Sequence, residues 1–254
     1  MNKEKIGKIK YHGCSCPFSF VQVTIISVYF INIIIFSIFW IPAFATSTAL
    51  LVVGIVLFYL FNISQGIFYI VASASNTTDP LIYEKNKHKR NNEEKKNEVS
   101  IIMENPKLKF CKKCNFTVSI DSYHCKECNK CTLNYDHHWF IIDNCVSNKH
   151  FNIFMCLIIM GIVSSAFQIA LVIIFYVYLN HFVKANLINA YKNDITSLSL
   201  FFVTFILLTN FTIFIYFIFK FIYHIVLKCY GLSSYQYDIQ KNEQKKAKKI
   251  VHII

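Results

Sequence analysis

The stretch that decides the fold of this chain runs from Cys111 to Cys145 and reads CKKCNFTVSIDSYHCKECNKCTLNYDHHWFIIDNC. It holds six of the ten cysteines, mostly as Cys-x-x-Cys pairs interleaved with histidines. Such spacings are typical of zinc sites, and zinc held by four protein ligands is structural. The candidate ligands are Cys111, Cys114, His124, Cys125, Cys128, Cys131, His138 and Cys145. Eight ligands form two tetrahedral sets, so the stretch predicts a small module stabilised by two zinc ions.

Four long apolar blocks flank this stretch, two before it and two after it. Each exceeds the roughly 20 residues that cross a bilayer as a helix, and in lipid such segments must be helical. Of the 254 residues, 55% are hydrophobic and only 16% are charged. The sequence therefore predicts an all-α polytopic membrane protein with four transmembrane helices and a zinc module between the second and the third. The blocks are Phe20–Phe44, Thr46–Ala74, Phe151–Phe182 and Ile195–Leu227.

The distribution of lysine and arginine predicts the orientation. The N-terminal segment has four, the connection from Ser75 to His150 has thirteen, and the tail after Leu227 has six. The other two connections have two in total, so 23 basic residues lie on one predicted side of the membrane and 2 on the other. By the positive-inside rule, both termini and the zinc module are cytosolic. Thiolate ligands also need a reducing compartment, which agrees with this orientation.

The predicted domain organisation follows from these segments. It comprises a cytosolic N-terminal segment (1–19), a transmembrane hairpin (20–74), a polar linker (75–106), the Cys-rich domain (107–150), two further transmembrane helices (151–227) and a basic tail (228–254). We interpret the charged runs Glu84–Glu98 and Lys241–Lys249 as solvated segments, with contact to anionic lipid headgroups as the alternative. The net charge is +12. Because the basic residues flank membrane spans, we expect no nucleic-acid partner.

The Cys-rich stretch resembles the cysteine-rich domain of the DHHC family of palmitoyltransferases. The family pattern is Cys-x2-Cys-x9-His-Cys-x2-Cys-x2-Cys-x4-Asp-His-His-Cys-x5-Cys, and every spacing agrees. The resemblance implies that Asp136 and His137 are the catalytic Asp and His. It also implies two ligand sets, which are Cys111, Cys114, His124 and Cys131 for one zinc ion and Cys125, Cys128, His138 and Cys145 for the other.

The flanking segments extend the resemblance over nearly the whole chain. Asp79-Pro80 resembles the family's Asp-Pro-Gly, and the segment from Cys145 to Phe154 resembles its Cys-Val-Gly-x2-Asn-x3-Phe. Ser233-Ser234-Tyr235-Gln236 stands where the family has Thr-Thr-x-Glu. By this resemblance, the candidate residues for binding acyl-CoA are Ser233, Ser234 and Gln236.

One position departs from the family in a way that bears on catalysis. The family cysteine attacks a fatty acyl-CoA thioester and passes the acyl chain to a cysteine of a substrate protein. This chemistry needs a thiolate, a histidine base and an aspartate that orients the base. Here Trp139 occupies the nucleophile's position, since the spacing from His138 to Cys145 is that of the family. An indole cannot form a thioester, so the resemblance predicts loss of the covalent route.

Three interpretations remain open. The first is a pseudoenzyme that binds acyl-CoA, a substrate protein or an active relative. The second is residual acyl transfer. Either His137, oriented by Asp136, deprotonates a substrate thiol directly, or a surrogate cysteine such as Cys156 or Cys229 replaces the nucleophile. Cys145 is a poor surrogate because it is a candidate zinc ligand. The third is a transporter or channel. Against it, the spans carry no charged residue that would mark a pathway, apart from Lys220 and the histidines His181 and His224 near the span ends.

The cofactors and partners expected are therefore two structural zinc ions, fatty acyl-CoA such as palmitoyl-CoA, membrane lipids, and protein substrates or an active family member. The expected location is a multi-pass position in an endomembrane (ER or Golgi) or the plasma membrane. Cys14 and Cys16 lie close to the first span, where palmitoylation is plausible. We expect Gly54, Gly161 and Asn210 to serve close packing and hydrogen bonding between helices.

Overall fold

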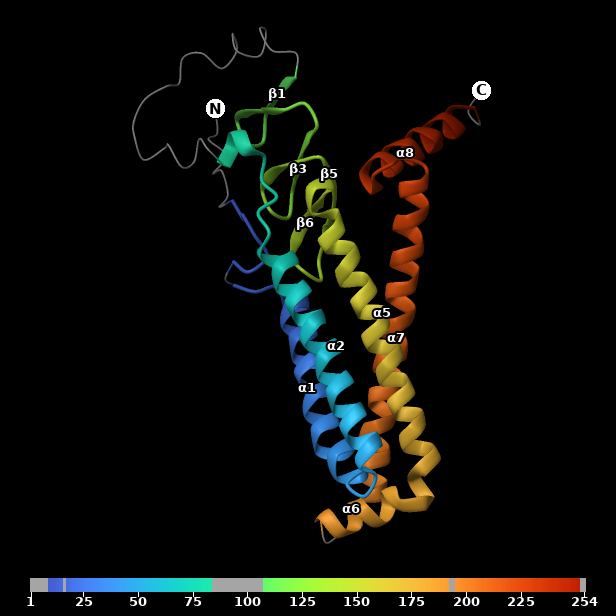
Figure 1. Cartoon of the computed structure of the whole chain (residues 1–254). Helices are drawn as coiled ribbons and strands as arrows, with labels where there is room; N and C mark the ends of the chain where they lie inside the picture. The colour runs from blue at the N-terminus through green and yellow to red at the C-terminus, as the bar shows by residue number, and fades with distance from the viewer. Residues whose placement is uncertain (1–8, 16, 84–106, 192–194, 252–254) are drawn as a thin grey trace, which may run out of the picture. The chain divides into compact units, whose positions relative to one another are not determined.

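The computed structural model describes residues 9–15, 17–83, 107–191 and 195–251 (Figure 1). Most of the linker predicted at 75–106, including the run Glu84–Glu98, lies outside the described residues, as does Cys16. The described chain divides into two compact units. Unit 1 comprises Met1–Ser19, Val71–Phe154 and His224–Ile254, and unit 2 comprises Phe20–Ile70 and Met155–Tyr223.

Among the residues that the structure describes, four helices are long and apolar enough to cross a membrane, which agrees with the predicted number of spans. The connection between the first two is short, and Pro42 lies in the last turn of the first helix, where its missing N–H removes one hydrogen bond of the ladder. The third helix ends earlier than predicted, and a π-helical turn, η2 (Leu179–Val183), leads into α6 (Lys184–Tyr191). The four helices are α1 (Phe20–Ala43), α2 (Thr48–Ala74), α5 (Phe151–Tyr178) and α7 (Thr196–Cys229).

Within unit 2, the core is built from stacked aromatic rings and close helix contacts. The ring centroids of Phe36 and Phe58 are 3.5 Å apart and nearly parallel. A Cβ added to Gly54 would lie 2.6 Å from the Trp40 indole, and one added to Gly161 would lie 2.5 Å from Phe217. Both glycines are therefore where two helices approach closely, as the sequence predicted.

Buried amides add hydrogen bonds between the helices of unit 2. Asn210 of α7 donates to the side-chain oxygen of Asn32 of α1 at 3.3 Å. Gln168 of α5 donates to the side-chain oxygen of Asn62 of α2 at 3.4 Å. Lipid tails offer no hydrogen-bond partners, so each buried amide needs a partner on a neighbouring helix. These amide pairs therefore favour one register between the helices. The role predicted for Asn210 is thus confirmed.

The Cys-rich module in unit 1 consists of three short antiparallel hairpins, which the ligand spacing alone did not predict. They pair β1 (Leu108–Cys111) with β2 (Phe116–Ser119), β3 (Ser122–Cys125) with β4 (Lys130–Leu133), and β5 (Tyr135–Trp139) with β6 (Asn144–Ser147). Asn115 and Asn129, each directly after a Cys-x-x-Cys pair, have φ near +50°. Asparagine tolerates this left-handed conformation better than most residues, which lets the chain reverse right after the second cysteine.

Two buried side chains tie the module to the segment that follows α2. The Asp79 carboxylate, fully buried, accepts hydrogen bonds from the backbone of Leu81 at 2.8 Å and Ser119 at 3.0 Å, and from the Ser122 hydroxyl. Asp79 also donates its own N–H to Cys131 O at 2.8 Å. It precedes Pro80, which starts a helical turn, so this carboxylate both caps that turn and anchors two strands.

Asn144 supplies the second tie. Its side-chain amide donates to the carbonyl oxygens of Ala72, Ser73 and Ser75 at 3.3, 3.2 and 2.7 Å. Ala72 and Ser73 lie in the last turn of α2, where carbonyls have no partner within the helix, and Ser75 directly follows that turn. The module thus caps the last turn of α2 with a buried amide.

We expect Asp79→Ala to destabilise the module by about 2 kcal/mol, because it leaves two partly buried backbone N–H groups and the buried Ser122 hydroxyl without their acceptor. Hydrogen exchange of the amides in β2 and β3 would measure this loss. Asp121→Ala removes an exposed carboxylate from the β2–β3 turn and should change the opening free energy by less than about 0.5 kcal/mol. Equal effects of the two substitutions would contradict the role given to Asp79.

Candidate functional site

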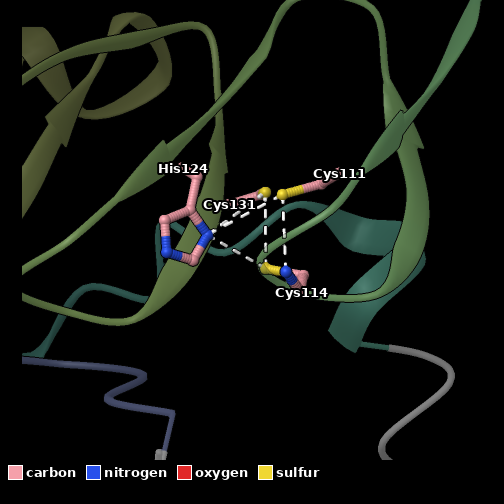
Figure 2. Close-up of side chains that lie close together, drawn as sticks. All are labelled: Cys111, Cys114, His124 and Cys131. Atoms are coloured by element: carbon pink, nitrogen blue, oxygen red, sulfur yellow. Dashed lines mark hydrogen bonds between the residues drawn. The ribbon is translucent and has the colours of Figure 1, made fainter. Parts of the chain in front are cut away.

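The first cluster of potential metal ligands contains Cys111, Cys114, His124 and Cys131 (Figure 2). Their donor atoms all lie within 4.8 Å of one another. Nδ1 of His124 is 3.1 Å from Cys114 Sγ, and the sulfurs of Cys114 and Cys131 are 3.5 Å apart. Tetrahedral zinc with Zn–S bonds of about 2.3 Å has S···S edges of about 3.8 Å, so the donors fit such an ion after small movements.

The second cluster contains Cys125, Cys128, His138 and Cys145. Nδ1 of His138 lies 3.4 Å from Cys128 Sγ and 3.7 Å from Cys125 Sγ. The sulfurs of Cys145 and Cys128 are 3.6 Å apart. The structure therefore brings the eight residues together in the same two sets of four that the resemblance implied.

Strand register explains how each set is assembled. In the β3–β4 hairpin, His124 pairs directly with Cys131, and in the β5–β6 hairpin, His138 pairs with Cys145. Directly opposed residues on an antiparallel pair have Cβ atoms about 5 Å apart, which suits two ligands of one ion. Each cluster then takes its Cys-x-x-Cys pair from the preceding turn.

The electrostatics of the first cluster favour a thiolate at Cys114, which in turn raises the pKa of Cys131. A hydrogen bond from Cys131 lowers the pKa of the Cys114 thiol to about 5, with help from His124 and against burial, which raises it. A lowered thiol pKa eases metal binding because the ligand must be deprotonated. At neutral pH, Cys114 is therefore ready to bind a cation.

The second cluster is surrounded by polar groups that the sequence analysis missed. Asp143 Oδ1 lies 3.5 Å from His138 Nε2, the nitrogen that does not face the sulfurs, and the same carboxylate pairs with Lys10. The backbone N–H of Lys10 donates to Cys128 O at 2.9 Å. A carboxylate behind a ligand histidine orients its ring.

Lys130 is the other group beside this cluster, and its side chain is completely buried. Its ammonium donates to Tyr11 O at 2.6 Å and to Asn144 Oδ1 at 3.3 Å. Burial lowers the pKa of Lys130, and the nearby thiolates of the second cluster oppose that shift. A divalent ion bound by three thiolates and a neutral imidazole carries a net negative charge, so Lys130 is placed as its counter-ion.

Asp136 and His137 lie side by side on β5. The Asp136 carboxylate is 6% exposed; it accepts the Ser234 backbone N–H at 2.6 Å and lies 3.7 Å from His137 Nδ1. Burial raises the pKa of Asp136, but the interactions with His137 and Ser234 outweigh it and leave the pKa below its ordinary value. The carboxylate is thus held ionised next to the imidazole.

Aromatic rings enclose His137. Its ring stacks on His224 of α7 at 5.1 Å and meets Phe154 edge to face at 5.4 Å. Both ring nitrogens of His137 are buried and have no hydrogen-bond partner among the described residues. His224 was noted in the sequence only as a polar residue near the end of a span, and no local pattern connects it to residue 137.

Trp139 belongs to the same aromatic group. Its side chain is 3% exposed, and its ring meets Phe154 edge to face at a centroid distance of 5.0 Å and an angle of 86°. Phe154 in turn lies 4.8 Å from His224. At the position of the family nucleophile, the chain therefore has a packed indole in contact with the rings that surround His137.

The residues expected to bind acyl-CoA lie at the start of α8 (Ser234–Val251). The Ser233 N–H donates to Gln236 Oε1 at 2.8 Å, and the Gln236 N–H donates to Ser233 Oγ at 3.2 Å. This reciprocal pair is a capping box, which begins a helix. The structure thus gives Ser233 and Gln236 a local structural role and places the Ser234 N–H at Asp136.

The proposed surrogate cysteines are dispersed. Cys145 is part of the second cluster, as expected. Cys156 is half-buried on α5, and Cys229 is exposed at the end of α7. Cys229 is the more accessible thiol of the two.

Comparison with known proteins relates this site to a family. A sequence model of the DHHC palmitoyltransferase family matches residues 104–241, more than half of the chain. A relative from Dictyostelium discoideum, whose name assigns it to the ZDHHC-type palmitoyltransferases, is 44% identical over 50 residues, which are 19% of this chain and 11% of that protein.

Two further relatives agree with this match. A relative from Arabidopsis thaliana, named for protein S-acyltransferase activity, is 37% identical over 51 residues, which are 20% of this chain and 17% of that protein. A palmitoyltransferase of Gibberella zeae is 36% identical over 61 residues, 23% of this chain and 8% of that protein. The aligned part of this chain spans less than a quarter of each of these three relatives.

We expect Lys130→Met to speed metal loss from the second cluster by about tenfold, because the buried counter-charge is removed. The metal content of the full chain in detergent, followed during competition with a chelator, would measure this rate. Lys126→Met, at an exposed position in the turn of the same β3–β4 hairpin, is the matched control. Unchanged retention in Lys130→Met would contradict a counter-ion role, whereas Lys130→Arg should retain the metal.

Proposed function

The chain belongs to the DHHC palmitoyltransferase family. We propose that it is a protein S-acyltransferase homologue that cannot form the acyl-enzyme thioester, because Trp139 replaces the nucleophilic cysteine. The position of Trp139 carries this proposal. A thioester intermediate requires a thiolate next to a base, and the buried indole beside His137 can provide none. The intact module and spans then serve to bind acyl-CoA, a substrate protein or an active relative.

The two clusters, in this proposal, each hold one structural zinc ion. The ligands of each are three cysteines and one histidine, with no position left for substrate. When bound, zinc cross-links hairpins whose own core is small. It does not take part in acyl transfer.

The helical core of unit 2 contains a small apolar cavity of about 30 Å³. It is lined by aromatic and aliphatic side chains with one polar residue, Gln168. This volume is close to that of one water molecule, so the cavity is a packing void and does not accommodate an acyl chain. Its aromatic lining residues are Phe36, Phe39, Trp40, Phe58 and Phe175.

A second candidate function is direct acyl transfer without an acyl-enzyme. It is favoured by the Asp136–His137 pair, which is 3.7 Å apart and held by the Ser234 N–H. His137 would take the proton of a substrate cysteine, whose sulfur would attack the acyl-CoA carbonyl. The bond between the acyl carbon and the CoA sulfur would break, and the CoA thiolate would recover the proton from His137.

The location and orientation remain part of the proposal. The excess of basic residues in the two termini and in the connection that contains the module supports a cytosolic position for these segments. Acyl-CoA and cysteine substrates would then be reached from that side of an endomembrane or the plasma membrane.

We expect no hydroxylamine-sensitive label on the purified chain after incubation with a clickable palmitoyl-CoA. Trp139→Cys restores the thiol and should be labelled, and the label should disappear in Trp139→Cys/His137→Ala because the base is lost. Label on the wild-type chain that requires His137 would overturn the loss of the covalent route and indicate a surrogate cysteine. Transfer to a cysteine peptide without self-acylation would instead support the direct route.

We expect two zinc ions per chain at neutral pH, and one each in Cys114→Ser and Cys128→Ser. Zinc should be lost only below pH of about 5, because protons compete with the metal for ligands such as Cys114, whose pKa is lowered to about 5, and bound zinc opposes protonation further. Elemental analysis of the protein equilibrated at each pH tests this. A content that stays constant down to pH of about 3 would refute thiolate ligation.

A further inference from the structure

The two ends of α8 differ in exposure. Its first turn is packed, because Ser234 is buried and the Tyr235 ring lies 4.1 Å from Tyr123 and 5.7 Å from Tyr135. Residues 240–248, in contrast, are all exposed among the described residues. Short helices without tertiary contacts are marginal in water, so this half of α8 is expected to have a partner.

The exposed half presents one face that combines an aromatic ring with positive charge. Tyr237, Lys241, Lys245 and Lys248 follow one another at helical spacing and therefore share a face. Lys241 Nζ lies 5.8 Å from the Tyr237 ring centroid. One acidic residue, Asp238, lies at the edge of this face, so positive charge dominates. Tyrosine beside lysine is typical of helices that lie at the surface of a bilayer.

The connection between α7 and α8 keeps this face near the membrane. Gly231, with φ of +67°, ends α7 in a Schellman motif, in which Gly231 N–H donates to Lys228 O and Leu232 N–H donates to Leu227 O, both at 3.0 Å. The capping box of Ser233 and Gln236 starts α8 directly afterwards. Even a fully extended chain from Cys229 to Ser234 spans no more than about 18 Å, so α8 starts close to the end of a span.

We propose that the face of α8 formed by Tyr237, Lys241, Lys245 and Lys248 binds the anionic phospholipid headgroups of the membrane that the chain spans. Each lysine adds attraction to a negative lipid surface, and this attraction weakens with salt. Because the first turn of the same helix donates the Ser234 N–H to Asp136, lipid binding holds that donor at the candidate site. The proposal does not depend on whether the chain transfers acyl groups.

Hydrogen exchange of the full chain in lipid nanodiscs tests this interaction. One preparation contains phosphatidylcholine alone, and the other contains phosphatidylcholine mixed with phosphatidylserine. We expect the amides of residues 240–248 to exchange about tenfold more slowly in the anionic nanodiscs. Raising the salt concentration should remove this difference. Equal protection in both lipids, or protection in neither, would overturn the proposal.

A second experiment removes the lysine charges of α8. The triple variant Lys241→Gln, Lys245→Gln, Lys248→Gln should lose the lipid-dependent protection. The matched control, Lys112→Gln, Lys113→Gln, Lys126→Gln, removes three exposed lysines of the module and should keep it. Unchanged exchange in β3 and β4 verifies that each variant is folded. If the control lost the protection equally, general charge would explain the effect and the assignment to α8 would be wrong.

Discussion

The grouping of eight cysteine and histidine side chains into two four-donor clusters is the constraint on which unit 1 depends. The hairpins have strands of four or five residues, and isolated hairpins of this size are not stable in water. Their apolar core is correspondingly small and includes Val118 and Ile82 together with the ligand Cys131. Cross-strand pairs such as His124 with Cys131 place two ligands of one cluster on neighbouring strands. Ligation would therefore fix the strand register as well as close the turns.

From the clusters, polar contacts lead outward to the rest of unit 1. Lys130 connects the thiolates of the second cluster to Asn144, and Asn144 caps the carbonyls at the end of α2. Asp79 anchors the segment after α2 to two strands. Buried polar groups of this kind are costly when any one partner is missing. Through these hydrogen bonds, the ligand clusters are connected to the end of α2, although no ligand residue lies in a span.

Trp139 is packed among the aromatic rings of the candidate site. Edge-to-face contacts with Phe154, and the contacts of Phe154 with His137 and His224, form one aromatic group around the candidate site. Such contacts stabilise a buried site by burying apolar area. A thiolate at this position would sit beside the base, whereas the indole fills the space. Asp136 nevertheless keeps its ionised state and its contact with the start of α8, so the arrangement around the base is retained without the nucleophile.

The sequence by itself determined the four spans and the eight candidate ligands, because hydropathy and ligand spacing are local properties of the chain. The assignment of the ligands to two particular sets came from the family resemblance. It also singled out Trp139, since one position in a fixed spacing is visible without a structure. Only the tertiary structure showed that His224 stacks on His137, that Lys130 and Asn144 connect the second cluster to the end of α2, and that Ser234 reaches Asp136. These contacts join residues about 14 to 98 positions apart, and their formation depends on hairpin register and helix packing, which no local pattern encodes.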